Sequence, residues 1–104
     1  MKGSSDLKEY ILFMHSDGKG SEEPEKWTEY FSRLRDSGRF QGGSAIGDGE
    51  CLRKEDTPGQ LHDSLSGYIR VLARDLDDAK TFVTGNPVCE AGGTVEIREL
   101  PKTS

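Results

Sequence analysis

The feature that most constrains the fold is an unbroken apolar run at residues 10–14, near the start of a chain that is otherwise polar. The run is short and rich in aromatic side chains, which favours a strand buried on both faces over a helix. Only 32% of the 104 residues are hydrophobic and 32% are charged, so few side chains remain to build a core. We therefore expect one small domain spanning residues 1–104, with a thin core and a flexible N-terminus at residues 1–7.

The clearest helix is expected at residues 21–37. Trp27, Tyr30, Phe31 and Leu34 follow the i, i+3, i+4, i+7 spacing that places side chains on one helical face. A second helix is expected at residues 75–84, where an Asp-rich start is followed by a Gly-Asn-Pro stop. β-branched or alternating patterns predict the remaining strands at residues 39–46, 50–54, 66–74 and 94–100.

This order of elements predicts an α+β domain in which both helices cover one face of an antiparallel sheet. A ferredoxin-like arrangement is the simplest topology with this order. The other face of the sheet would need a cover if Tyr10, Phe13, Tyr68 or Ile69 projects from it. We therefore expect a symmetric homodimer, because a second copy of the chain can cover that face.

Charge and composition exclude several classes of partner. The net charge of −5 disfavours binding to a nucleic-acid backbone or to an anionic membrane surface. No stretch approaches about 18 consecutive apolar residues, and residues 1–8 lack the apolar region of a signal peptide. Cys51 and Cys89 are expected to be reduced thiols. We therefore expect a cytoplasmic protein without nucleic-acid or membrane partners.

Candidate catalytic residues stand at the end of the first strand and in the polar segment before the fourth. His15 and Asp17 are two residues apart, so on an extended chain they point the same way and could form a general base oriented by a carboxylate. His62 and Asp63 form a second pair. The alternative for both pairs is a solvated loop. A metal site built from His15, His62 and a carboxylate would lack regular spacing, so we expect no metal and no cofactor.

Candidate ligand-binding residues are His15, Asp17, Trp27 and Tyr68. Trp27 either belongs to the core or lines a cleft between helix and sheet, where small ligands commonly bind. Gly42-Gly43 lies within a predicted strand and does not open a helix. The glycine pair therefore indicates a bulge and not a phosphate-binding loop.

Four blocks of the chain carry a family resemblance: KEYILFMHSD, SRLRDSGRFQGGSAI, SGYIRVLARDLDDAKTFVTGNP and GGTVEIREL. Together, from about residue 8 to residue 100, they resemble the YCII-related family in its DGPF-type branch. The resemblance implies a ferredoxin-like fold that dimerises as an αβ barrel. It implies little about activity, because most members have none assigned.

A minority of that family resembles a lyase of chloroaromatic breakdown, for which a histidine and an aspartate are proposed in the active site. The aspartate corresponds to Asp36 here, but Trp27 stands at the position of the histidine. The motif that gives the branch its name falls near residues 55–58, which read Glu-Asp-Thr-Pro. The resemblance therefore implies a divergent member.

Three functions follow from these observations. The first is a dimeric domain that binds or senses a small molecule without catalysis, and the missing family histidine favours it. The second is a small lyase- or hydrolase-like enzyme acting on an aromatic or acidic metabolite, with His15 or His62 and Asp17 as its catalytic groups. The third is a regulatory protein-interaction module.

Overall fold

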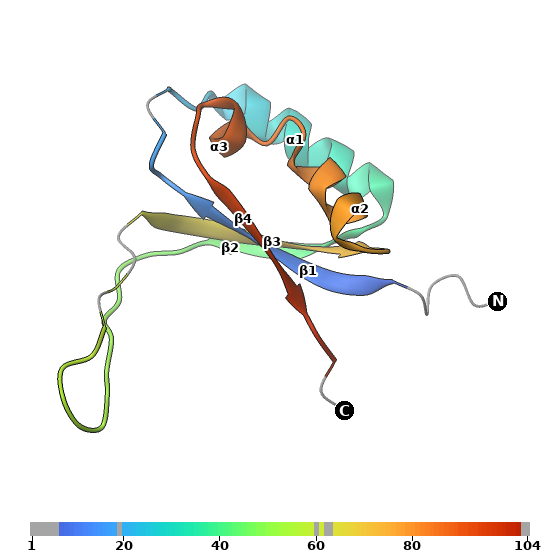
Figure 1. The fold of residues 1–104 in the computed structure, drawn as a ribbon. Coiled ribbons are helices and arrows are strands. Elements are labelled where there is room, and N and C mark those ends of the chain that lie inside the picture. Colours follow the sequence, from blue (N-terminus) through green and yellow to red (C-terminus); the bar gives the residue numbers. More distant parts are fainter. Residues whose placement is uncertain (1–6, 19, 60, 62–63, 103–104) are drawn as a thin grey trace.

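A computed structural model describes residues 7–18, 20–59, 61 and 64–102 of the chain. The protein is an α+β domain with one four-stranded antiparallel sheet in the order β2-β3-β1-β4, which is compatible with the ferredoxin-like arrangement. All helices lie on one face of the sheet (Figure 1). The elements are β1 (Lys8–His15), α1 (Pro24–Ser37), β2 (Phe40–Ala45), β3 (Leu65–Ala73), α2 (Leu76–Lys80), the 3₁₀ turn η2 (Thr81–Val83), α3 (Pro87–Glu90) and β4 (Val95–Leu100).

Helix α1 has clear start and stop signals. Pro24 occupies the first turn, where its missing N–H costs no helical hydrogen bond, and Glu25 lies at the positive end of the helix dipole. Gly38 ends the helix in the left-handed region, with φ of 75°, and its N–H donates to the Arg35 carbonyl at 3.1 Å. The helix is shorter than the predicted 21–37 because Glu23 is still extended.

Strand β1 is a central strand of the sheet, and its alternate side chains meet different surroundings. Tyr10, Leu12 and Met14 are buried in the core beneath the helices. Ile11 and Phe13 are only half-buried. The prediction of a strand buried on both faces is therefore wrong for a single chain, because the described helices all lie on the other face of the sheet (Figure 1). We call this uncovered side the open face.

Of the four side chains that could have projected from the open face, two lie on the helix side of the sheet and two on the open face. Tyr10 and Ile69 are buried on the helix side, with exposed fractions of 3% and 1%. Phe13 and Tyr68 are paired across β1 and β3, and each lies between buried neighbours along its own strand. Strand alternation therefore places their side chains on the open face.

The predicted bulge at the glycine pair is confirmed. The pairing of β2 with β3 shifts register between Phe40 and Gly42, and Gly42 has φ of 120°. A Cβ atom on Gly43 would come within 2.5 Å of the Tyr68 carbonyl oxygen, so the neighbouring backbone leaves no room for a side chain there.

The predicted strand at residues 50–54 is wrong, because these residues form no strand. The segment has glycines just before it, and its main apolar side chain, Leu52, is 85% exposed and gains no burial. A strand is stable only when it pairs and buries one face. Figure 1 shows the green loop that follows β2 projecting away from the sheet.

The region after α2 also differs from the prediction. The helix expected at 75–84 is α2 followed by the turn η2. Beyond the predicted end of that helix, Pro87–Glu90 form a further short helix, α3. The Asn86 side chain is fully buried, and its Oδ1 accepts hydrogen bonds from the backbone N–H groups of Val88 at 2.9 Å and Cys89 at 3.2 Å. This cap, with Pro87 in the first turn, stabilises a helix too short to show periodicity.

Two further points concern the chain as a whole. Apart from Leu7, the predicted flexible N-terminus at residues 1–7 lies outside the described residues. Within the described ranges, no helix is long and apolar enough to cross a membrane.

Candidate functional site

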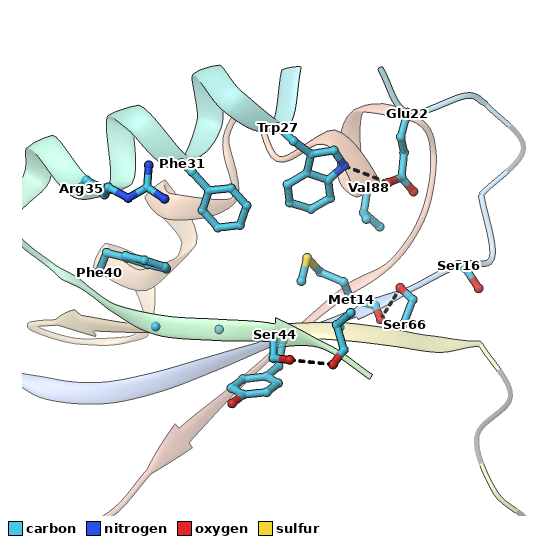
Figure 2. Close-up of a pocket in the computed structure, with 15 residues that line it drawn as sticks. Met14, Ser16, Glu22, Trp27, Phe31, Arg35, Phe40, Ser44, Ser66 and Val88 are labelled. Atoms are coloured by element: carbon cyan, nitrogen blue, oxygen red, sulfur yellow. Dashed lines mark hydrogen bonds between the residues drawn. The ribbon is translucent and has the colours of Figure 1, made fainter. Parts of the chain in front are cut away.

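A cavity of about 630 Å³ lies between helix α1 and strands β2 and β3. We call it the α1–β2 pocket, and Figure 2 shows its side chains. Its walls come from elements that are distant in sequence but adjacent in the fold. The lining residues are Met14, Ser16, Glu22, Trp27, Phe31, Arg35, Phe40, Gly42, Gly43, Ser44, Ala45, Ser66, Gly67, Tyr68 and Val88.

Aromatic side chains form one wall of the pocket. The rings of Trp27 and Phe31 stack with centroids 5.5 Å apart, one turn of α1 from each other. Phe40 of β2 continues this wall, with its ring 5.7 Å from that of Phe31. Trp27 is half-buried and packs against the core while lining the pocket, so it combines both roles considered from the sequence.

The opposite wall is made of small residues. Gly43, Ala45 and Gly67 line the pocket, and β2 and β3 pair Gly43 with Ile69 and Ala45 with Gly67. Ile69 and Gly67 are buried on the helix side. At these positions a packed sheet usually carries β-branched side chains that fill the space beneath a helix. The pocket therefore exists because three neighbouring helix-facing positions have almost no side chain.

Opposite charges border the two ends of the pocket. The Glu22 carboxylate accepts a hydrogen bond from Trp27 Nε1–H at 3.0 Å. The Arg35 guanidinium lies over the Phe31 ring, with Cζ 5.8 Å from the centroid, and within the described part of the chain it forms no ion pair. Figure 2 shows Arg35 and Glu22 at opposite ends of the aromatic wall. A ligand with an apolar body and an acidic group at one end would complement this arrangement.

Tyr68, expected to bind a ligand, is also a lining residue of the pocket. Strand alternation places its side chain on the open face, while its carbonyl oxygen lies close to Gly43. The ring of Tyr68 is therefore separated from Trp27 by the sheet. The sequence did not identify Phe40, Arg35 or Glu22 as pocket residues, because their convergence depends on how α1 packs across β2.

His15 and Asp17 are not among the described residues that line the α1–β2 pocket, although His15 borders a separate cleft of about 200 Å³. The imidazole of His15 hydrogen-bonds Ser64 Oγ through Nδ1 at 2.9 Å and Glu96 Oε1 through Nε2 at 3.2 Å. Its orienting carboxylate is therefore Glu96, which neighbouring strand β4 brings to the end of β1. His62 and Asp63 lie outside the described residues.

Hydrogen bonds of Asp17 connect the loop after β1 to the start of β4. Its carboxylate accepts hydrogen bonds from Thr94 Oγ1 at 2.7 Å and from the Thr94 backbone N–H at 2.8 Å. These bonds hold the pKa of Asp17 below its ordinary value of 3.8, with a smaller contribution from His15. The carboxylate expected to orient His15 thus has a structural partner of its own.

Among residues 7–18, 20–59, 61 and 64–102, no group of three His, Cys, Asp or Glu side chains is arranged to hold a metal ion. No protein-family model matches the chain, and no curated protein is significantly similar to it.

Proposed function

We propose that this protein is a dimeric domain that binds a small molecule in the α1–β2 pocket. The observation that carries the proposal is the pairing of an aromatic wall, Trp27 and Phe31, with a wall of small residues across a cavity of about 630 Å³. Pockets that enclose small ligands commonly measure roughly 300–1,000 Å³ and combine apolar walls with a few polar groups.

The charges at the pocket ends suggest the chemistry of the ligand. The Arg35 guanidinium can donate two hydrogen bonds to a carboxylate or similar anion, while Trp27 and Phe31 contact a flat apolar body. Glu22 at the other end disfavours a second anionic group there. An acidic metabolite with one anionic group and an aromatic or other flat body fits these features.

The open face supports dimerisation by a second copy of the same chain. Ile11, Phe13, Tyr68 and Leu72 are half-buried there, and none of the described helices covers them (Figure 1). Charged residues stand beside them, since Ile11 is paired with Arg70 and Arg98 on the neighbouring strands. Apolar side chains gathered on an uncovered face, with polar residues around them, often mark an interface. Because a twofold axis brings identical patches together, apolar side chains of one copy would meet those of the other. Two sheets packed in this way would form the αβ barrel.

The element order also supports membership, as a divergent branch, of the YCII-related family. The sheet order β2-β3-β1-β4 is compatible with the ferredoxin-like fold that this resemblance implies. Trp27 stands at the position of the family histidine and packs as a pocket wall, which favours binding over lyase chemistry. The acidic composition favours a location in the cytoplasm.

The binding proposal can be tested with anilinonaphthalene sulfonate, a fluorescent dye that combines a flat aromatic body with one anionic group. We expect saturable binding by the folded protein. Ala45→Leu should abolish it, because Ala45 is exposed and lines the pocket, so a larger side chain fills the cavity. Ser32→Leu is the matched control, since Ser32 is exposed on α1 and is not a lining residue.

The role of Arg35 is tested by comparing charged and uncharged probes. Arg35→Gln should weaken the sulfonate dye about tenfold, the loss expected for one hydrogen bond to a charged group, and leave an uncharged naphthol unaffected. Fluorescence titration gives both affinities. Dye binding that persists unchanged in Ala45→Leu would place the dye elsewhere and overturn the assignment of the pocket.

A further inference from the structure

Three polar side chains form a row at the end of the sheet where β1 ends. His15 is the last residue of β1, Ser64 immediately precedes β3, and Glu96 is the second residue of β4. His15 Nδ1 lies 2.9 Å from Ser64 Oγ, and His15 Nε2 lies 3.2 Å from Glu96 Oε1. The imidazole thus stands between a hydroxyl and a carboxylate.

A carboxylate beside one ring nitrogen of a histidine favours the tautomer that carries its proton on that nitrogen. An ionised Glu96 can only accept hydrogen bonds, so His15 Nε2 carries the proton that it receives. In the neutral ring Nδ1 is then an acceptor, and the Ser64 hydroxyl donates to it. The order hydroxyl, imidazole, carboxylate is the arrangement that activates a serine as a nucleophile, here with Nδ1 facing the serine.

Backbone hydrogen bonds hold the row in place. The Ser64 carbonyl accepts from the Ser16 backbone N–H at 2.6 Å and from Ser16 Oγ at 3.2 Å. The His15 backbone N–H donates to the Thr94 carbonyl at 2.9 Å. The His15 side chain is only 12% exposed, whereas that of Glu96 is 44% exposed. The base is therefore fixed and shielded while the row remains open to solvent on one side.

We propose that Ser64 is a nucleophile for small uncharged carboxylic esters, with His15 as its general base and Glu96 as the residue that positions His15. Ser64 Oγ attacks the ester carbonyl, its proton passes to His15 Nδ1, and the C–O bond to the leaving group breaks as that alkoxide takes the proton. Water then attacks the acyl-serine by the same route and releases the acid. Ser64, His15 and Glu96 do not line the α1–β2 pocket, so the proposed reaction does not depend on ligand binding there.

The direct test is covalent labelling with a fluorophosphonate, in which Ser64 Oγ bonds to phosphorus and fluoride leaves. Peptide mapping by mass spectrometry should find one adduct, on Ser64, and none in Ser64→Ala. His15→Ala should slow labelling at least about 100-fold, the usual contribution of a general base, and added imidazole should restore part of the rate. Ser32→Ala is the control, because Ser32 is exposed on α1 outside the row and its loss should leave the labelling of Ser64 unchanged.

Hydrolysis of p-nitrophenyl acetate tests whether Glu96 positions His15 for the reaction or only stabilises the fold. Glu96→Gln should lower kcat and leave KM unchanged, with a circular dichroism spectrum like that of the parent. Labelling of other serines in place of Ser64, or a Ser64 labelling rate unchanged by His15→Ala, would overturn the proposal. Failure of His15→Ala to respond to imidazole, with its fold retained, would also contradict it.

Discussion

The two faces of the sheet are built from the same strands but differ in what they meet. On the helix side Leu12 is fully buried, and its neighbours Tyr10 and Met14 are nearly so. On the open face Ile11 and Phe13 come from the same apolar run but are only half-buried. Similar hydrophobicity thus gives different burial, because burial depends on a second layer that the strand itself does not specify.

The two faces also differ in how they hold polar groups. On the helix side, small residues at Gly43, Ala45 and Gly67 leave a cavity with charges only at its ends. On the open face, charges pair across strands, as Arg70 does with Glu9 at 2.6 Å. The helix side therefore has space for a ligand. On the open face the charged side chains pair with each other, and the apolar side chains remain available to contact another protein surface.

The largest effect expected from this comparison is on stability. Leu12→Ala should lower the free energy of unfolding by about 2–5 kcal/mol, since it opens a cavity in the buried core. Ile11→Ala, one residue away on the open face, should cost clearly less at protein concentrations where the chain is monomeric. Urea unfolding of the two variants measures the difference. Equal losses in dilute protein would show that the open face is already covered within one chain.

A smaller effect on stability is expected outside both faces, in the loop where Asp17 accepts hydrogen bonds from Thr94. Because hydrogen bonds from Thr94 hold the folded pKa of Asp17 below 3.8, folding favours the ionised carboxylate. Its contribution to stability is complete above pH 3.8 and is lost as the pH falls through the lowered pKa. Asp17→Asn should therefore reduce Tm at pH 7 and lose most of its effect in strong acid. A Tm difference that is independent of pH would contradict this role.

Periodicity predicted the parts of the fold that are long enough to show it. The apolar run of β1, the stripe through Trp27 and Leu34 on α1, and the alternation in β4 all indicated the observed elements. Periodicity could not show that residues 50–54 lack a strand to pair with, or that the buried Asn86 side chain caps a helix of one turn.

The sites were less predictable than the fold, because they depend on strand register and helix packing. Trp27 was identified as a cleft residue from its place on α1, whereas Arg35 and Phe40 converge with it only after β2 docks beneath the helix. The spacing of His15 and Asp17 suggested a pair. The register of β4 instead brings Glu96 to His15 and Thr94 to Asp17.

The most direct measurement of the central claim is the mass of the protein in solution by sedimentation equilibrium at micromolar concentration. The open face predicts a dimer, and Phe13→Lys should dissociate it, because it replaces an apolar side chain between Tyr68 and Glu96 on that face by a charged one. Leu76→Lys is the matched control, since Leu76 is 46% exposed on α2, on the helix side, and should leave the dimer intact. A parent protein that sediments as an 11.5 kDa monomer would contradict the claim that a second copy covers the open face.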